Sequence, residues 1–196
     1  MNPKRLALIV STLALLLIAI VAVISANSNS SNISSFSIGN GQGPSIGSLA
    51  PNFTLPIVDY QNTPKKSGNI SLQSLKGQPV ILSFFASWCT ECRTELPLLA
   101  SAAKTEKGRI SILGIDSGDS LNSAISLLNQ DHANFLVGSD PNQEVSGSLY
   151  ALRGLPYSVF ISKNGTVTAK YLGALTFSQL SSEITKMGGL PLKPQS

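Results

Sequence analysis

The chain has 196 residues, a formal net charge of +4 and only 12% charged residues. Lys4 and Arg5 account for two of its 14 basic residues, which leaves 12 basic against 10 acidic side chains in the remainder. The chain has no basic run interleaved with aromatic residues, no glycine-rich phosphate loop and no internal repeat. These features exclude a nucleic-acid-binding function that depends on a basic surface, and the length suits one domain with appendages.

The N-terminus carries an apolar run that is long enough to cross a membrane. Residues 6–25 contain no charged residue, and at 1.5 Å per residue they span a hydrocarbon core of about 30 Å. Lys4 and Arg5 precede the run, so residues 1–5 are expected in the cytoplasm and the rest of the chain outside. A cleaved signal peptide is the alternative, and it would make the protein secreted. Both interpretations place the following domain outside the cytoplasm.

A polar segment separates this run from the globular part. Residues 26–48 are mostly Ser, Asn and Gly, which predicts a flexible linker. Residues 49–190 form the expected domain, and 191–196 form a short tail.

Within the domain, strand-like and helix-like patterns alternate. Strands are expected at 52–55, 80–85, 110–116, 135–137, 158–162 and 166–171, and helical segments at 71–77, 93–104, 121–128, 143–151 and 177–187. Asn164-Gly165 is a hairpin turn signal between the last two strands, and Pro97 is expected to kink its helix. The pattern predicts a mixed α/β sheet with helices on both faces.

Both cysteines, Cys89 and Cys92, lie where the strand 80–85 gives way to a helix. Unpaired N–H groups and the positive end of the helix dipole favour a thiolate there. The second sulfur, three residues later, is close enough for a small disulfide. An ionised attacking thiol and a resolving partner are what thiol–disulfide exchange requires.

Two other roles for the pair are possible. A structural zinc site wants four Cys or His ligands, and His132 is the only histidine, so no metal is expected. His132 itself is expected at the surface. A purely structural disulfide would close a loop of only two residues and would constrain the unfolded chain little.

Trp88-Cys89-Thr90-Glu91-Cys92 after a buried strand, Pro97 five residues later, and Gly154-Leu155-Pro156 before a hairpin resemble the thioredoxin fold. More narrowly, the chain resembles the membrane-anchored TlpA/ResA-type thiol–disulfide oxidoreductases of cytochrome c biogenesis. The resemblance covers roughly residues 47–189. It implies a thioredoxin fold with an N-terminal extension and a central insert, behind a single transmembrane helix, with no cofactor.

The resemblance also implies roles for individual residues. Cys89 would be the exposed nucleophile and Cys92 the buried resolving thiol of a redox-active disulfide. Pro156 would be a cis-proline that docks the substrate together with Leu155. Trp88 would pack against the motif and contribute to substrate binding, the alternative being plain core burial.

Glu95 lies three residues after Cys92 on the same helical face. A carboxyl group partly buried there would have a raised pKa and could exchange a proton with Cys92. Ordinary thioredoxins use a buried Asp on the preceding strand, where this chain has Ser83, whereas the resembled family has a Glu at the position of Glu95. The alternative is a solvated helix glutamate.

Glu91 stands where the family more often has Pro, and its charge should disfavour a Cys89 thiolate, which points to a reductant. The expected partners are exported disulfide-containing proteins, apocytochrome c among the clients that the resemblance suggests, and a transmembrane electron donor. One rival is a peroxiredoxin-type thiol peroxidase, although Ala86 occupies the position of the required Thr. Another is a non-catalytic, tethered binding or chaperone module.

Overall fold

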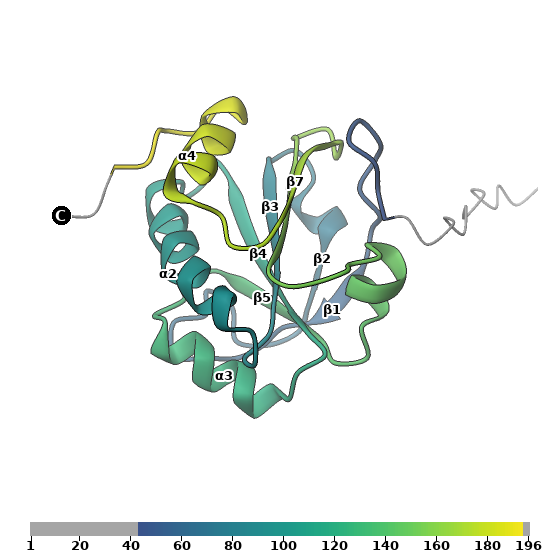
Figure 1. Cartoon of the computed structure of the whole chain (residues 1–196), viewed down its shortest axis with the longest axis vertical. Helices are drawn as coiled ribbons and strands as arrows, with labels where there is room; N and C mark the ends of the chain where they lie inside the picture. The colour runs from purple at the N-terminus through teal and green to yellow at the C-terminus, as the bar shows by residue number, and fades with distance from the viewer. Residues whose placement is uncertain (1–42, 194–196) are drawn as a thin grey trace, which may run out of the picture. The chain divides into compact units, whose positions relative to one another are not determined.

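A computed structural model describes residues 43–193, and its central element is a five-stranded mixed sheet (Figure 1). The strand order is β5-β4-β3-β6-β7. β3 pairs in parallel with β4, and β4 with β5, whereas the β3–β6 and β6–β7 pairs are antiparallel. The strands are β3 (Val80–Phe85), β4 (Ser111–Ser117), β5 (Leu136–Asp140), β6 (Tyr157–Ile161) and β7 (Val167–Leu172).

The central strand, β3, is buried at every residue, as its apolar sequence predicts for a strand covered on both faces. Its C-terminal residue Phe85 pairs with Asp116 of β4. On its other side, Ser83 lies opposite Ser158 of β6. The residues that follow β3 therefore leave the sheet at its centre, between these two neighbours.

Three α-helices complete the main framework: α2 (Thr90–Thr105), α3 (Leu121–Gln130) and α4 (Phe177–Lys186). Ser120 caps α3 by accepting the Ser123 N–H, and Thr176 caps α4 in a capping box with Gln179. The α2 helix begins with Cys89 as its N-cap, and it continues through Pro97 to Thr105.

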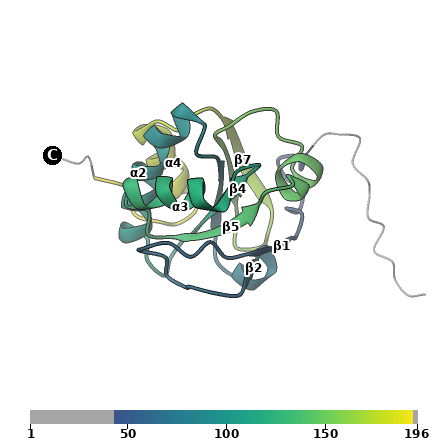
Figure 2. The same cartoon turned by 90° about the horizontal axis from the view of Figure 1, so that it is seen from below.

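The three α-helices pack on one face of the sheet, and the helices that cover the other face are short and not α-helical (Figures 1 and 2). Helices therefore lie on both faces, as predicted, but the α-helices do not. One buried cluster joins Leu96 of α2, Leu128 of α3 and Leu180 of α4 to the sheet. The reason is topological: β3, β4 and β5 follow one another across the sheet, and right-handed crossovers in one direction place both connecting helices on the same side.

The opposite face is covered by short elements. These are the antiparallel pair β1 (Thr54–Pro56) and β2 (Asn69–Ser71), the 3₁₀ helix η1 (Leu72–Leu75) and the π-helix η2 (Glu144–Leu149). Together with Phe84 and Tyr150 they enclose a second apolar cluster. The helical turns expected at 71–77 and 143–151 are therefore present, but neither is a full α-helix.

Strand boundaries differ from the sequence prediction by a few residues. The strand expected at 135–137 begins at Leu136, because the Tyr60 hydroxyl donates to the Phe135 carbonyl and accepts from the Phe135 N–H. Those backbone groups are thereby taken from the sheet ladder. The strand expected at 52–55 begins only at Thr54 and ends at Pro56.

The ends of the described region are fixed to the domain. Residues 43–48, expected as the end of the linker, lie along the sheet edge, where Gly47 N–H bonds the Val167 carbonyl and Ser48 O accepts the Val167 N–H. In the expected tail, Leu192 is buried. The apolar run 6–25 lies outside the described residues. Among residues 43–193, no helix combines the length and apolar character that a membrane span needs.

Candidate active site

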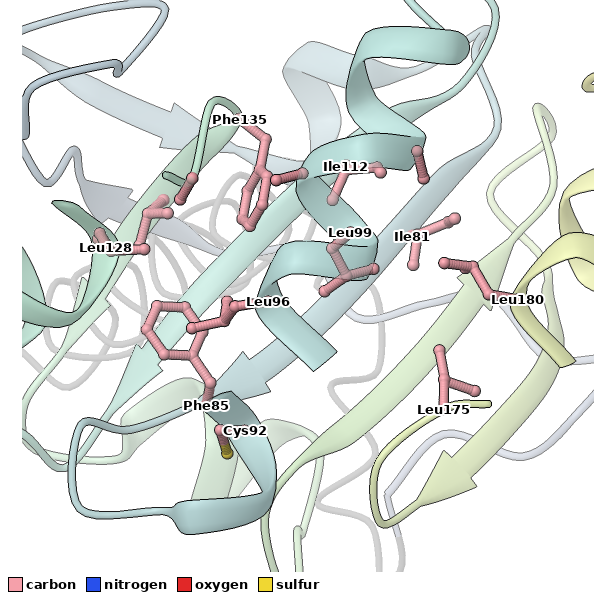
Figure 3. Close-up of a cluster of buried hydrophobic side chains, with 14 of the residues drawn as sticks. Ile81, Phe85, Cys92, Leu96, Leu99, Ile112, Leu128, Phe135, Leu175 and Leu180 are labelled. Carbon is pink, nitrogen blue, oxygen red and sulfur yellow. The ribbon is translucent and has the colours of Figure 1, made fainter. Parts of the chain in front are cut away.

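The two sulfur atoms are bonded to each other at the start of α2. The Cys89–Cys92 S–S distance is 2.07 Å, and the two Cα atoms lie 5.3 Å apart. Cys92 packs beside Phe85 and Leu96 at one end of the buried cluster (Figure 3). The chain therefore forms the small disulfide that its Cys-x-x-Cys spacing predicts.

The first cysteine is held against the helix terminus by its own sulfur. Cys89 is the N-cap of α2, and its Sγ accepts the Cys92 N–H at 3.2 Å. Amide donors and the helix dipole at this position favour negative charge on Sγ once the disulfide is reduced. The same terminus also carries Glu91, exposed in the first turn, whose carboxylate acts in the opposite direction.

Accessibility distinguishes the two cysteines, although less than expected. Cys92 is completely buried, whereas Cys89 is 5% exposed. The predicted order therefore holds, but Cys89 is not an open surface thiol in the disulfide form. The reason is local: its sulfur is bonded to a buried partner and lies over the first turn of α2.

Glu95 is buried on the inner side of α2, one turn after Cys92, with 1% of its surface exposed. Burial raises its pKa from 4.5 to about 7, and a hydrogen bond from Ser158 partly offsets that rise. The Ser158 hydroxyl donates to Oε1 at 2.8 Å, while Oε2 has no hydrogen-bond partner. A solvated glutamate is thus ruled out, and the carboxyl group titrates near neutral pH.

Ser158 is a site residue that sequence reasoning missed. It is the second residue of the buried strand β6, and its only sequence signal is a hydroxyl group among mostly apolar residues. It pairs across the sheet with Ser83, the position that an Asp occupies in ordinary thioredoxins, and the Ser83 hydroxyl oxygen has no partner. The Glu95 carboxyl therefore reaches from α2 to the β3–β6 pair that carries Ser83.

The loop before β6 contains the predicted cis-proline. The Leu155–Pro156 peptide bond is cis, and the Pro156 carbonyl accepts the Gly173 N–H at 2.9 Å. Leu155 is half-buried and packs against both apolar clusters, one of which includes the two cysteines. Leu155 thus packs against the buried cluster that also contains both cysteines.

Trp88 is 62% exposed, so core burial does not describe it. Its indole N–H points to the Gly118 carbonyl at 3.4 Å. Together with Leu155 it lines a shallow cavity of about 190 Å³, whose other walls include Gln143 and Ser146 at η2. Trp88 and Leu155 therefore form an apolar part of the cavity lining next to the cysteine loop, and Gln143 and Ser146 form a polar part.

A second buried carboxyl group, Asp116, was not anticipated from the sequence. It lies near the end of β4 with no exposed surface, and neither of its oxygens accepts a hydrogen bond from an N–H or O–H group. Its polar neighbour is the Asp119 carboxyl group, and a hydrogen bond between the two side chains needs a proton on one of them. Burial raises its pKa to about 8, and the nearby Asp119 and Asp140 carboxylates add to the rise. Asp119 in turn accepts the Ser87 N–H at 2.6 Å, two residues before Cys89.

The surroundings of Cys89 bear on two alternatives, a thiol peroxidase and a zinc site. In the described region, the hydrogen bond to its Sγ comes from the Cys92 N–H, and Ala86 supplies no hydroxyl group. Arg93 donates to the Ser87 carbonyl and to Gln130, so its guanidinium is engaged away from the sulfur. His132 is exposed, and residues 43–193 contain no group of three or more potential metal ligands.

Comparisons with known proteins agree with this geometry. Residues 46–170 match the AhpC/TSA family. The thiol-disulfide oxidoreductase ResA of Bacillus thuringiensis (strain Al Hakam) is 32% identical over 143 residues, which are 72% of this chain and 78% of the relative. ResA of Bacillus subtilis (strain 168) is 30% identical over 137 residues, 69% and 72% of the two chains.

Solved structures show the same fold. A crystal structure from Chlorobium tepidum, provisionally described as the thiol:disulfide interchange protein DsbE, superposes with a TM-score of 0.66 and 28% identity. The match covers 75% of this chain and all of that one.

Proposed function

Because the chain belongs to the AhpC/TSA family and to its ResA-type thiol–disulfide oxidoreductases, we propose that it reduces disulfides in exported proteins from a membrane-tethered position. It is a thiol–disulfide oxidoreductase with a thioredoxin-like fold. The observation that carries the proposal is the Cys89–Cys92 bond at the N-terminus of α2, with a buried, near-neutral carboxyl group one turn further on.

The proposed reaction is a double displacement between sulfur atoms. The reduced Cys89 thiolate attacks one sulfur of a client disulfide and releases the other client sulfur as a thiol. Cys92 then attacks Sγ of Cys89 in the mixed disulfide. The client leaves with both sulfurs reduced, and the pair is left as the disulfide seen here, two electrons having passed to the client.

Glu95 is assigned the proton of Cys92. Cys92 is completely buried, so its thiol has no direct path to bulk water for losing a proton. A carboxyl group whose pKa is about 7 holds a proton in about half of the molecules at neutral pH. Glu95 can therefore accept the Cys92 proton as the mixed disulfide is resolved and return it when the pair is reduced again.

Client contacts are assigned to Trp88, Leu155 and Pro156. Trp88 and Leu155 share the walls of one cavity, and Pro156 follows Leu155 directly. Trp88 is exposed and Leu155 is half-buried, whereas Pro156 itself is buried. Accessible apolar side chains beside a reactive sulfur suit a client segment that is not yet folded, because such a segment has apolar side chains to bury. The polar wall at Gln143 would contact the client backbone or a polar side chain.

The proposal also covers where the domain lies and in which direction electrons flow. Residues 6–25 would hold the domain outside the cytoplasm, where conditions are usually oxidising, so a transmembrane donor must renew the dithiol. The Glu91 carboxylate next to the pair supports a reductant over a strong oxidant. Apocytochrome c is the client class that the family resemblance suggests.

Insulin-disulfide reduction tests the activity. Full-length protein in detergent, with dithiothreitol as the electron source, should precipitate insulin chains well ahead of the dithiothreitol control. The Cys89→Ser variant should match that control. If the wild type gives no acceleration while the double-Ser variant binds unfolded clients as well as the wild type, the non-catalytic module would replace this proposal.

A further inference from the structure

Asp116 is a buried acid that the exchange mechanism does not use. It has no exposed surface, and neither oxygen accepts a hydrogen bond from an N–H or O–H group, so the only hydrogen bond its side chain makes within residues 43–193 is the one shared with the Asp119 carboxyl group, which requires a proton. Buried polar groups are almost always paired, and an unpaired buried carboxylate is costly in free energy. A carboxyl group kept in such a place therefore calls for a physical explanation.

The charges around Asp116 are all of one sign. Asp119 in the following loop and Asp140 of β5 both raise its pKa, while α3 has no charged residue. Near the start of α2, Glu91 and Arg93 are exposed and Glu95 is bonded to β6. Arg93 donates to the carbonyl of Ser87, the same loop residue whose N–H Asp119 accepts. Among residues 43–193, no cation lowers the pKa of Asp116, so this carboxyl group stays neutral to a higher pH than an ordinary Asp does.

Two hydrogen bonds connect this acidic end of β4 to the loop that carries the nucleophile. The Asp119 carboxylate accepts the Ser87 N–H at 2.6 Å, and the Gly118 carbonyl lies 3.4 Å from the Trp88 indole nitrogen. The strand register adds a third link, since Asp116 pairs with Phe85, four residues before Cys89. A new charge on Asp116 would thus act on Asp119 and, through it, on the cysteine loop.

We propose that Asp116 is a proton-holding positioning residue of the redox site: its neutral form lets Asp119 keep the Ser87 amide in place, and its ionisation disfavours the Cys89 thiolate. The proposal deepens the proposed function and rests on it, because Cys89 is taken as the attacking sulfur. When Asp116 loses its proton, its buried negative charge lies near the half-buried Asp119 and adds to the negative field at Cys89.

The test follows the alkylation of Cys89 by iodoacetamide in the reduced full-length chain, quantified by peptide mass spectrometry from pH 5 to 10. A Glu95→Gln background removes the other near-neutral carboxyl group. With Asp116 present, the pH profile should be broader than a one-proton curve. Asp116→Asn should sharpen it to one proton and raise the rate about threefold near pH 8, while leaving it unchanged at pH 6.

Matched variants separate this role from a structural one. Glu106→Gln alters another fully buried carboxyl group, at the far end of α2, and should leave the profile unchanged. Asp119→Asn keeps an acceptor for Ser87 but removes the neighbouring charge, so the Asp116 step should move to lower pH. This second variant decides the matter if Asp116→Asn does not fold.

Superimposable profiles with and without Asp116, or an Asp116 step that Asp119→Asn fails to move, would overturn the inference. Alkylation needs no client, so this result is independent of the insulin assay. If the protein reduces insulin but the alkylation profiles with and without Asp116 superimpose, only the inference about Asp116 is overturned. A confirmed profile without any insulin reduction would instead remove the proposed function.

Discussion

The hydroxyl group of Ser158 donates to Oε1 of Glu95 at 2.8 Å, and this contact joins the helix that carries both cysteines to the β6 strand. Burial pushes the Glu95 carboxyl towards its neutral form, whereas the Ser158 hydrogen bond favours the ionised form. The balance of the two leaves the group titrating near neutral pH, which is the range that general acid–base catalysis needs.

Removing the Ser158 hydroxyl should raise the pKa of Glu95. Ser158→Ala deletes the one contact that lowers it and leaves burial unchanged. The pH dependence of disulfide exchange should therefore move to higher pH. The matched control is Ser83→Ala, which removes the hydroxyl directly across the sheet, one whose oxygen has no hydrogen-bond partner. Equal shifts in both variants would show that packing, not this hydrogen bond, sets the pKa.

Replacing Glu95 by Gln should slow the step that uses Cys92. The amide preserves the shape but cannot carry the proton, so resolution of a mixed disulfide should slow by about 100-fold, the lower range for general acid–base catalysis. Stopped-flow kinetics with a preformed mixed disulfide measure this step directly. The first attack by Cys89 should change much less. An equal loss in both steps would argue against a proton-transfer role.

Stability of the disulfide form should fall as the pH rises from about 4 to about 8. Glu95 and Asp116 both have pKa values raised above those of the unfolded chain, so the folded state binds more protons in this interval. The contribution of these two groups to the free energy of unfolding is fully present below the unfolded-state pKa values. It is lost as the pH rises through the folded-state pKa values.

The size of the effect follows from the pKa values. Moving Glu95 from 4.5 to about 7, at about 1.4 kcal/mol per pKa unit, gives about 3 kcal/mol. Urea unfolding at pH 5 and pH 8 measures it, and Glu95→Gln should reduce the difference by roughly that amount. A free energy of unfolding that rises over this interval would contradict the ionisation behaviour assigned to both acids.

Trp88 should matter for protein clients and not for folding. Because its side chain is 62% exposed, Trp88→Ala should change the free energy of unfolding by less than about 1 kcal/mol. Exchange with a protein disulfide should slow several-fold, while exchange with a small aromatic disulfide should not. Leu190→Ala, at an exposed leucine next to Glu106, is the control and should affect neither. Parallel losses with both substrates would point to disruption of the cysteine loop.

Much of the fold could be predicted because the strongest signals are local. The buried β3 strand, the Asn164-Gly165 hairpin and the α4 helix each follow from apolar periodicity and turn residues within a short segment. The placement of all three α-helices on one face could not be predicted in the same way. It depends on the order in which strands pair, and that order is set by contacts between segments distant in sequence.

In the candidate site too, features set by local sequence could be predicted, and features set by contacts between distant segments could not. The disulfide and the near-neutral Glu95 were predictable, since three-residue spacings on one helix fix which side chains share a face. The partners Ser158 and Asp116 were not, because each reaches the site from another strand and neither carries a local motif. Trp88 was expected near the motif, but its exposure depends on the Gly118 loop against which it lies.

The central claim is that Cys89 attacks and Cys92 resolves. Full-length Cys92→Ser protein, incubated with a client peptide that carries a disulfide, should accumulate a mixed disulfide, and tandem mass spectrometry should place the client sulfur on Cys89. Cys89→Ser should accumulate little, because its remaining thiol is completely buried. Preferential trapping on Cys92 in the Cys89→Ser variant would contradict the assignment of the two sulfurs and the mechanism built on it.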